Sequence, residues 1–178
     1  MPQETKRTIP SDLIEATAFE LMRRAAIEIP EDFRLGVEAM VDTEAEDLSR
    51  FVLESMVENW HAAEEDRRAM CADTGLPRYY VKAGNEAVIG GGFVALERAL
   101  RRATARATHE IPLRPNRVHP LSRADHNNNV GINAPEIEFS FEPDADWLDI
   151  TTVHKGGLFG TDYRMLFPGD GKDGIKRF

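Results

Sequence analysis

Residues 70–81, with the sequence MCADTGLPRYYV, decide the predicted fold. The sequence before them is typical of helices, and the sequence after them is typical of strands. The Asp, Gly and Pro residues of the first half are typical of a tight loop. Tyr79, Tyr80 and Val81 predict a strand directly after it. Cys71, the single cysteine of the chain, is therefore expected on a loop between a helix and a strand.

Three helices are predicted before this loop, and the first is indicated by apolar residues that recur at helical spacing from Leu13 onward. We expect Ser11 and Asp12 to cap the first helix and Pro30 to stop it. Pro30 also suits the first turn of a short second helix that reaches Val41, since proline lacks the N–H that this position leaves unpaired.

The third helix is expected to begin at the capping-box pattern of Thr43 and Glu46 and to run to about Arg68. Acidic residues lie on one side of it and an apolar face lies opposite. That face holds Leu48, Phe51, Val52, Ser55, Met56 and Trp60.

A fourth helix follows the glycines at 90–92, which lack the Lys-Ser or Lys-Thr pair of a phosphate-binding loop and so predict a helix entrance or hinge. Its opposite sides differ in chemistry, and the basic side is either a solvated face or a surface for an acidic partner subunit. The apolar side holds Phe93, Leu96, Ala99, Leu100 and Ala103, and the basic side holds Arg98, Arg101, Arg102 and Arg106.

Residues 112–135 are rich in Pro, Asn, Arg and His without a sustained period, and a long ordered loop of this kind is more often functional than idle. Strands are predicted at 137–141 and 147–153, with a turn at Lys155. The order of elements predicts an α+β fold in which amino-terminal helices are followed by a mixed sheet with flanking helices. We expect a single domain over residues 1–178.

The composition and net charge limit the classes of molecule that this chain is expected to bind. The formal net charge of −9 repels nucleic acid phosphates and anionic membrane surfaces, so neither is an expected partner. No stretch approaches the roughly 20 apolar residues that span a bilayer, and the polar start lacks the core of a signal peptide, so a cytoplasmic location is expected. The lone Cys71 excludes an internal disulfide and is either a small buried hydrophobe or a reactive group.

The loop itself resembles a known signature. Cys71, Asp73, Thr74 and Gly75 match the Cys-Gln-Asp-Thr-Gly motif of class I fumarases and of the alpha subunit of L-tartrate dehydratase, with Ala72 in place of glutamine. Three further elements follow in the same order as in that family. They are Leu-Arg...Val-x-Pro-Leu at 113–121, Gly-x-Asn-x-Pro at 131–135, and the start of Lys-Gly-Gly-Gly-Ser at 155–157.

The resemblance implies the amino-terminal part of an iron-sulfur hydro-lyase, a carbon-oxygen lyase that acts on a small hydroxycarboxylic or dicarboxylic acid. It implies a 4Fe-4S cluster with Cys71 as the first ligand and one iron open to substrate, and Asp73 beside the substrate as a catalytic group. Arg114 would clamp a carboxylate, as guanidinium geometry allows. The substrate-binding set would be completed by Lys155, Gly156 and Gly157.

Each of these residues also has a plain structural interpretation. Asp73 can form a turn with its own backbone, Arg114 can be a surface arginine, and the two glycines can end a strand. The sequence also departs from the family, because Leu158, Phe159, Gly160 and Thr161 stand where Gly, Ser and further polar residues are usual. These departures, with Ala72, put fumarate or tartrate as the substrate in doubt and could also mark a member without activity.

One cysteine cannot hold a cluster that takes three or four thiolates. The other ligands would come from a longer chain or from a separate polypeptide, so the expected partners are the remaining alpha region or a beta subunit, in a dimer or heteromer. The alternative is a cluster-free structural or regulatory subunit of the same fold that docks a partner chain. A mononuclear metal site is a weaker interpretation of His109, His119, Asp125 and His126, because their spacing lacks ligands one helical turn apart.

Overall fold

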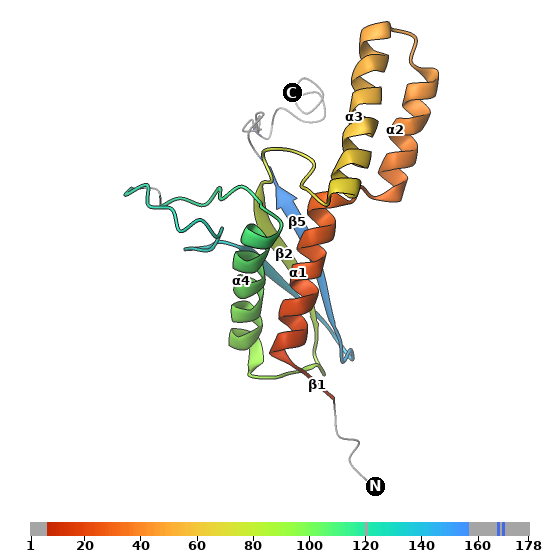
Figure 1. Cartoon of the computed structure of the whole chain (residues 1–178). Coiled ribbons are helices and arrows are strands. Elements are labelled where there is room, and N and C mark those ends of the chain that lie inside the picture. Colours follow the sequence, from red (N-terminus) through yellow and green to blue (C-terminus); the bar gives the residue numbers. More distant parts are fainter. Residues whose placement is uncertain (1–6, 120, 157–166, 168, 170–178) are drawn as a thin grey trace.

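The computed structural model describes residues 7–119, 121–156, 167 and 169 and confirms the predicted α+β class (Figure 1). Helices come first and the strands of the main sheet come later, as the sequence predicts. In chain order the elements are β1 (Thr8–Ile9), α1 (Ser11–Ile27), α2 (Glu31–Thr43), α3 (Asp47–Asp66), β2 (Leu76–Gly84), β3 (Val88–Ile89), α4 (Gly92–Glu110), β4 (Glu136–Glu142) and β5 (Leu148–Lys155).

The main sheet is mixed and has the strand order β4-β2-β5. Strand β2 pairs in parallel with β4, from Arg78 opposite Glu136, and antiparallel with β5, from Leu76 opposite Lys155. The connection from β4 to β5 crosses the end of β2, where a Cβ on Gly84 would lie 2.3 Å from the carbonyl oxygen of Ala145. Only glycine leaves room for that crossing.

Helices α1 and α4 lie side by side against the sheet (Figure 1) and enclose the core with it. Met22 of α1, Leu96 and Leu100 of α4, and Tyr79 of β2 are each 0% exposed. The Tyr79 hydroxyl donates a hydrogen bond to Met22 Sδ at 2.8 Å, and burial raises the pKa of this phenol above its ordinary value. The helical face predicted for residues 93–103 is confirmed except at Phe93, which is 49% exposed.

The predicted helix caps are wrong in detail. Pro10 occupies the N-cap of α1 without a side-chain cap, and Ser11 instead accepts a hydrogen bond from Arg102 at 3.1 Å. Thr43 ends α2, so it does not open α3, and its hydroxyl donates back to the carbonyl oxygen of Ala39 at 3.0 Å. The carboxylate of Glu44 accepts the free N–H groups ahead of α3, because it lies close enough in sequence to reach them.

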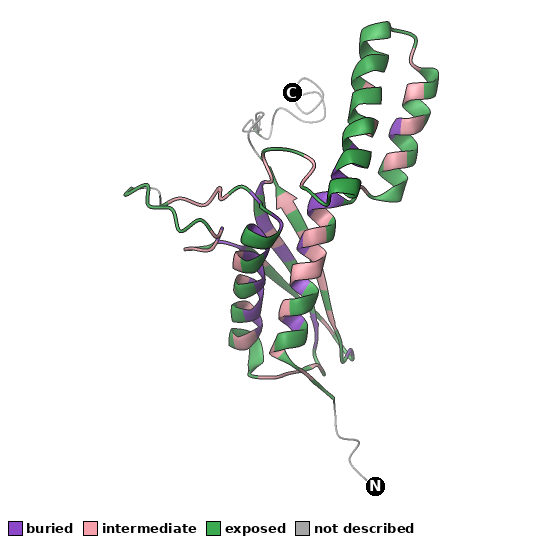
Figure 2. Ribbon diagram, in the orientation of Figure 1, coloured by how far each residue is buried: buried purple, intermediate pink, exposed green. Residues whose placement is uncertain are grey.

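Helices α2 and α3 form a hairpin that projects from the end of α1, away from the sheet (Figure 1), and we call residues 31–66 the arm. The arm is mostly exposed (Figure 2), in contrast to the purple core of the body. Trp60 is its one large buried aromatic side chain among the described residues, with Phe33 at 6.0 Å between ring centroids. The face predicted for α3 is otherwise open to solvent.

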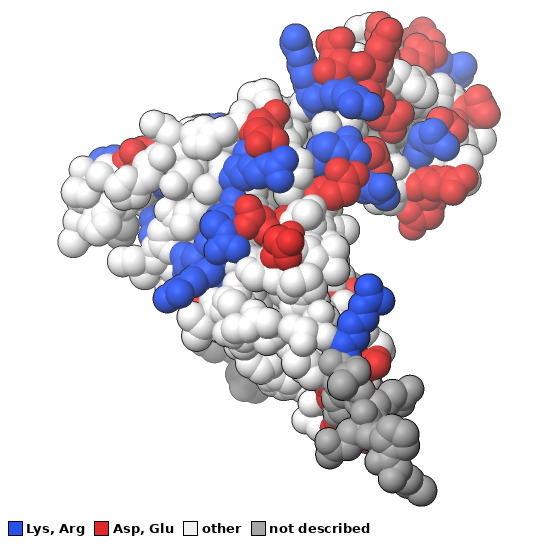
Figure 3. Space-filling model, turned by 60° about the horizontal axis from the view of Figure 1, so that its bottom comes forward, with Lys and Arg blue, Asp and Glu red and all other residues white. Residues whose placement is uncertain are grey.

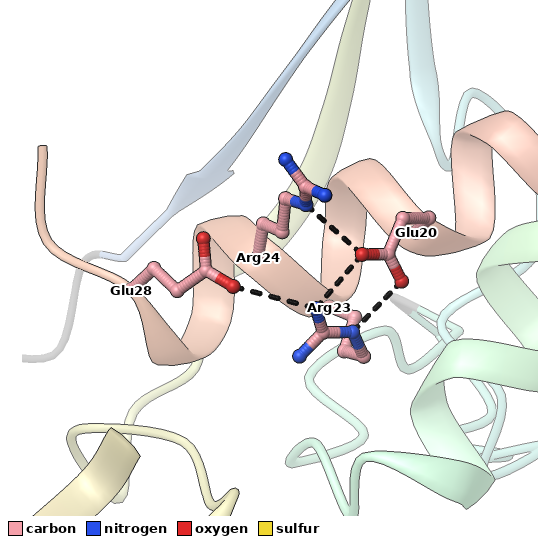
Figure 4. Close-up of polar contacts among 4 residues, drawn as sticks. All are labelled: Glu20, Arg23, Arg24 and Glu28. Carbon is pink, nitrogen blue, oxygen red and sulfur yellow. Dashed lines mark hydrogen bonds and ion pairs between the residues drawn. The ribbon is translucent and has the colours of Figure 1, made fainter.

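Charged side chains line the junction between body and arm. Glu20 accepts hydrogen bonds from Arg23 at 2.8 Å and Arg24 at 2.9 Å, and Arg23 also contacts Glu28 at 3.3 Å (Figure 4). The hydrogen bonds from these arginines lower the pKa of Glu20 to about 2. A hollow of about 580 Å³ lies beside them, and its lining includes Arg67, the residue directly after the arm. No helix in the described part of the chain is both long and apolar enough to cross a membrane.

Candidate functional site

The Cys71 loop is held against the end of β5. Cys71 is exposed, and its thiol donates to the carbonyl oxygen of Asp73 at 3.0 Å. Gly75 adopts a φ of +73°, and a Cβ there would lie 2.6 Å from the carbonyl carbon of Lys155. The glycine of the loop is therefore required by both its backbone conformation and the close approach of a neighbouring strand.

Asp73 lies at the centre of the candidate site. Its side chain is only 10% exposed, and Oδ1 lies 3.8 Å from Nη1 of Arg114, whose side chain is 49% exposed. Asn116 donates through Nδ2 to Asp73 Oδ1 at 3.3 Å and to the Gly75 carbonyl oxygen at 2.9 Å. Two loops separated by some 40 residues thus meet at one carboxylate.

A second set of polar contacts fixes the loop that carries Arg114. The Arg114 N–H donates to Thr74 Oγ1 at 2.8 Å, and the Asn116 N–H donates to Asn129 Oδ1 at 2.8 Å. Asn129 is 1% exposed and donates to Thr108 Oγ1 at 3.2 Å and to the Arg114 carbonyl oxygen at 3.1 Å. Because a buried amide must find partners, Asn129 ties this loop to the last turns of α4.

Sequence reasoning missed Asn116 and Asn129. Asn129 ends a run of three asparagines that is typical of a turn, and nothing in the run distinguishes the buried member from its neighbours. Asn116 follows Pro115 two residues after Arg114, and that spacing is the only signal that could have suggested it.

A cavity of about 170 Å³ opens next to the loop and is lined by Met70, Cys71, Asp73, Thr74 and His154, with three alanines. His154 belongs to β5, and its Nε2 lies 3.0 Å from the carbonyl oxygen of Met22. Burial lowers the pKa of His154, against the opposing effect of the Met22 and Thr74 backbone groups. The cavity therefore holds a thiol, a carboxylate and a neutral imidazole beside small apolar groups.

The other predicted residues lie at the same end of the sheet. Lys155 is the last residue of β5 and is exposed, so the predicted turn begins after it. A Cβ on Gly156 would lie 3.5 Å from Asp73 Oδ2, which places the Gly156 backbone next to the carboxylate. Gly157, together with residues 158–161, lies outside the described residues.

The described ranges contain no group of three or more His, Cys, Asp or Glu side chains that could hold a metal ion. This includes His109, His119, Asp125 and His126, of which Asp125 instead accepts the N–H of Asn127 at 2.7 Å. Cys71 can offer one thiolate to a metal cluster, and the remaining ligands of such a cluster would have to come from elsewhere.

The arrangement can bind and orient a small anion. Arg114 offers an exposed guanidinium suited to a carboxylate, and Asp73 offers an acceptor that is held in place from two sides. The Gly156 backbone approaches the same point without a side chain in the way. Cys71 is exposed and lies two residues before Asp73, on the same cavity.

Comparison with known proteins gives a consistent result. The family model described as Fumarate hydratase (Fumerase) matches residues 15–178. A protein of Methanocaldococcus jannaschii named "Putative L(+)-tartrate dehydratase subunit alpha" is 35% identical over 170 residues, which are 93% of this chain and 59% of that protein. "L(+)-tartrate dehydratase subunit alpha" of Escherichia coli strain K12 is 26% identical over 181 residues, 100% of this chain and 58% of that protein. The chain thus spans about three fifths of the length of these relatives.

Proposed function

Because the chain belongs to the fumarate hydratase family, we propose that it is the amino-terminal part of an iron-sulfur-dependent hydro-lyase. Its substrate would be a small hydroxycarboxylic or dicarboxylic acid of the fumarate, malate or tartrate type. The observation that carries the proposal is the meeting of exposed Cys71, fixed Asp73 and Arg114 at one end of the sheet. These residues come from two separate loops, and chance surface groups would not be expected to converge in this way.

The residues present fit a cluster to which this chain gives one ligand. The Cys71 thiol is exposed on a loop and is not sealed among hydrocarbon side chains, so it is accessible to iron. A 4Fe-4S cluster would supply a Lewis acid that polarises the leaving hydroxyl of the substrate. The other cysteine ligands would come from a region of the protein beyond this chain or from a partner subunit.

The remaining residues would bind and orient the acid. Arg114 would pair with a substrate carboxylate through two parallel N–H groups. In a dehydration, a base takes the carbon-bound proton, the electron pair of that bond becomes the new carbon-carbon double bond, and hydroxide leaves with its own pair. Asp73 would contact the hydroxyl or carry a proton, with Asn116 keeping its carboxylate in position. Lys155 and the Gly156 backbone would complete the anion-binding surface.

Partners follow from the same proposal. The relatives are named as alpha subunits, so a beta subunit would be the expected partner of this chain. A cytoplasmic location and the absence of nucleic acid and membrane partners remain predictions from composition.

The test is anaerobic reconstitution of the chain together with its partner region, comparing the wild type with Cys71→Ser. We expect oxygen-sensitive brown protein, with iron and hydro-lyase turnover, and loss of both in C71S. Met70→Leu, next to the cysteine, is the matched control and should keep both. Colourless, iron-free and inactive wild-type protein would overturn the proposal in favour of a cluster-free structural or regulatory subunit, which should also tolerate C71S.

A further inference from the structure

The hollow of about 580 Å³ between body and arm is lined by charged groups of both signs, and we call it the junction hollow. Its lining comes from the end of α1, the start of α2, the end of α3 and the residue after α3. Figure 3 shows basic and acidic side chains close together where the arm meets the body. Three of the lining residues are arginines and three are glutamates, so the formal charge of the lining is zero. They are Arg23, Arg34, Arg67, Glu28, Glu31 and Glu64.

Only the charges next to α1 are paired. Arg23 Nη2 lies 2.8 Å from Glu20 Oε1 and 3.3 Å from Glu28 Oε1. The remaining two arginines and two glutamates have no side-chain hydrogen bond or ion pair with any described residue. They are Arg34, Arg67, Glu31 and Glu64. The junction hollow therefore holds two positive and two negative charges that this part of the chain leaves uncompensated.

Arg34 gives the clearest sign of a missing partner. Its Nε is buried and has no hydrogen-bond partner among the described residues, although Arg34 as a whole is half-buried. A buried donor without an acceptor is unfavourable, and a bound water or ion is one common explanation for it. Arg67 lies on the same hollow and is exposed. Two guanidinium groups are thus available there to an acceptor such as a carboxylate.

A ligand that satisfies this lining must carry both charges. An anion such as phosphate would meet the unpaired carboxylates of Glu31 and Glu64, and a metal ion would meet the unpaired arginines. A zwitterion can place its carboxylate on guanidinium nitrogens and its ammonium group on carboxylate oxygens. Ile27 and Ile29 add apolar atoms to the lining, so a short aliphatic side chain also has a surface to contact. The volume of the hollow lies in the range of small-molecule sites, roughly 300–1,000 Å³.

We propose that the junction hollow binds a free α-amino acid with a short aliphatic side chain. The carboxylate of the amino acid pairs with Arg34 and Arg67. Its ammonium group pairs with Glu31 and Glu64, and its side chain contacts Ile29. The ligand thereby bridges the two helices of the arm at the point where they join the body. The junction hollow shares no lining residue with the cavity of the candidate site, so its ligand is independent of the proposed function.

Titration calorimetry of the full-length protein with L-leucine tests the proposal. We expect one L-leucine per chain, with a dissociation constant of about 1 mM or lower. Two analogues each lack one of the charges: 4-methylpentanoate has no ammonium group, and 3-methylbutylamine has no carboxylate. Each should bind about tenfold or more weakly than L-leucine, because half of the lining charges stay unpaired. An analogue that binds as tightly as L-leucine overturns the proposal, and so does the absence of L-leucine binding at about 10 mM.

Neutral variants show whether binding occurs in the junction hollow. Arg67→Gln and Glu64→Gln each remove one exposed charge and should weaken L-leucine binding about tenfold or more. The matched controls are the neighbouring changes Arg68→Gln and Glu65→Gln, at exposed positions that do not line the hollow, and they should bind as the wild type does. Thermal melts check that all four variants are folded. Unchanged binding in R67Q and E64Q, or an equal loss in the two controls, overturns the proposal.

Discussion

The body and the arm are both built from amphipathic helices, yet only the body buries its apolar faces. Ala18 of α1 and Ala99 and Ala103 of α4 are each 0% exposed in the core that these helices form with the sheet. The arm presents Leu48 and Phe51 to solvent. Amphipathic spacing therefore identifies the face of a helix that needs a partner, and it does not say whether the same chain supplies one.

The largest expected effect is in the body. Leu100→Ala removes a fully buried side chain between α1, α4 and β2, so it loses the transfer free energy of the removed groups and leaves a cavity. We expect the free energy of unfolding to fall by about 2–5 kcal/mol in urea denaturation. A decrease in the free energy of unfolding of less than about 1 kcal/mol would mean that the body is packed as loosely as the arm, and it would contradict the difference between the two regions.

A smaller effect is expected at a polar contact, where Asn129→Ala removes the buried amide that holds the Arg114 loop. The Asn116 N–H and the Arg114 carbonyl oxygen would lose their partner, so a cost of about 1–3 kcal/mol is expected in the free energy of unfolding. The matched variant in the arm is Asn59→Ala, whose exposed amide donates to the Met70 carbonyl oxygen at 2.9 Å. Equal losses at the two sites would contradict the difference in burial.

Lowering the pH should reduce the free energy of unfolding of the body through the protonation of His154. Burial lowers the pKa of this imidazole, so below its ordinary value near 6.5 the unfolded chain binds a proton that the folded chain resists. The free energy of unfolding should therefore fall as the pH drops from about 6.5 toward 5, with a slope of at most about 1.4 kcal/mol per pH unit from this residue. Glu20, whose pKa is lowered to about 2, contributes only at lower pH, below its ordinary value of 4.5.

The His154 contribution is isolated by His154→Gln. Its unfolding free energy should depend less on pH in this window than that of the wild type, as measured by urea titration at several pH values. Parallel curves for the two proteins would show that another group causes the loss.

The smallest effect is expected in the arm, where Phe51→Ser shortens a side chain that is already 64% exposed. The free energy of unfolding of the dilute chain should change by no more than about 0.5 kcal/mol. A loss of several kcal/mol at low concentration would place Phe51 in the core of a single molecule.

The sequence predicted the fold where local pattern and tertiary packing agree. The helical period of α1, the buried face of α4, the loop that carries Cys71 and the strands on either side of residues 143–147 follow from periodicity and turn chemistry. The caps at Ser11 and Thr43 were wrong, because several polar residues near a helix start can satisfy the same N–H groups and local sequence does not rank them.

The candidate site was only partly accessible to sequence. Cys71, Asp73, Arg114 and Gly156 were chosen from motifs, and the structure brings them to one end of the sheet. The supporting residues were missed, since Asn129 acts through contacts with segments about 15 to 20 residues away that no local pattern records. The roles of all these residues in catalysis stay predictions.

Leu76 of β2 pairs with Lys155 of β5, so the register of these two strands sets the position of Gly156 relative to Asp73. Adding or deleting one residue within β5 would slide the Gly156 backbone past Asp73 by about 3.3 Å and turn the β5 side chains after that position to the opposite face of the sheet. The crossing at residues 143–147, outside the ladder, does not set this alignment. Insertions and deletions in this family should therefore occur in the loops and not within the strands, because the strand register positions the residues of the candidate site.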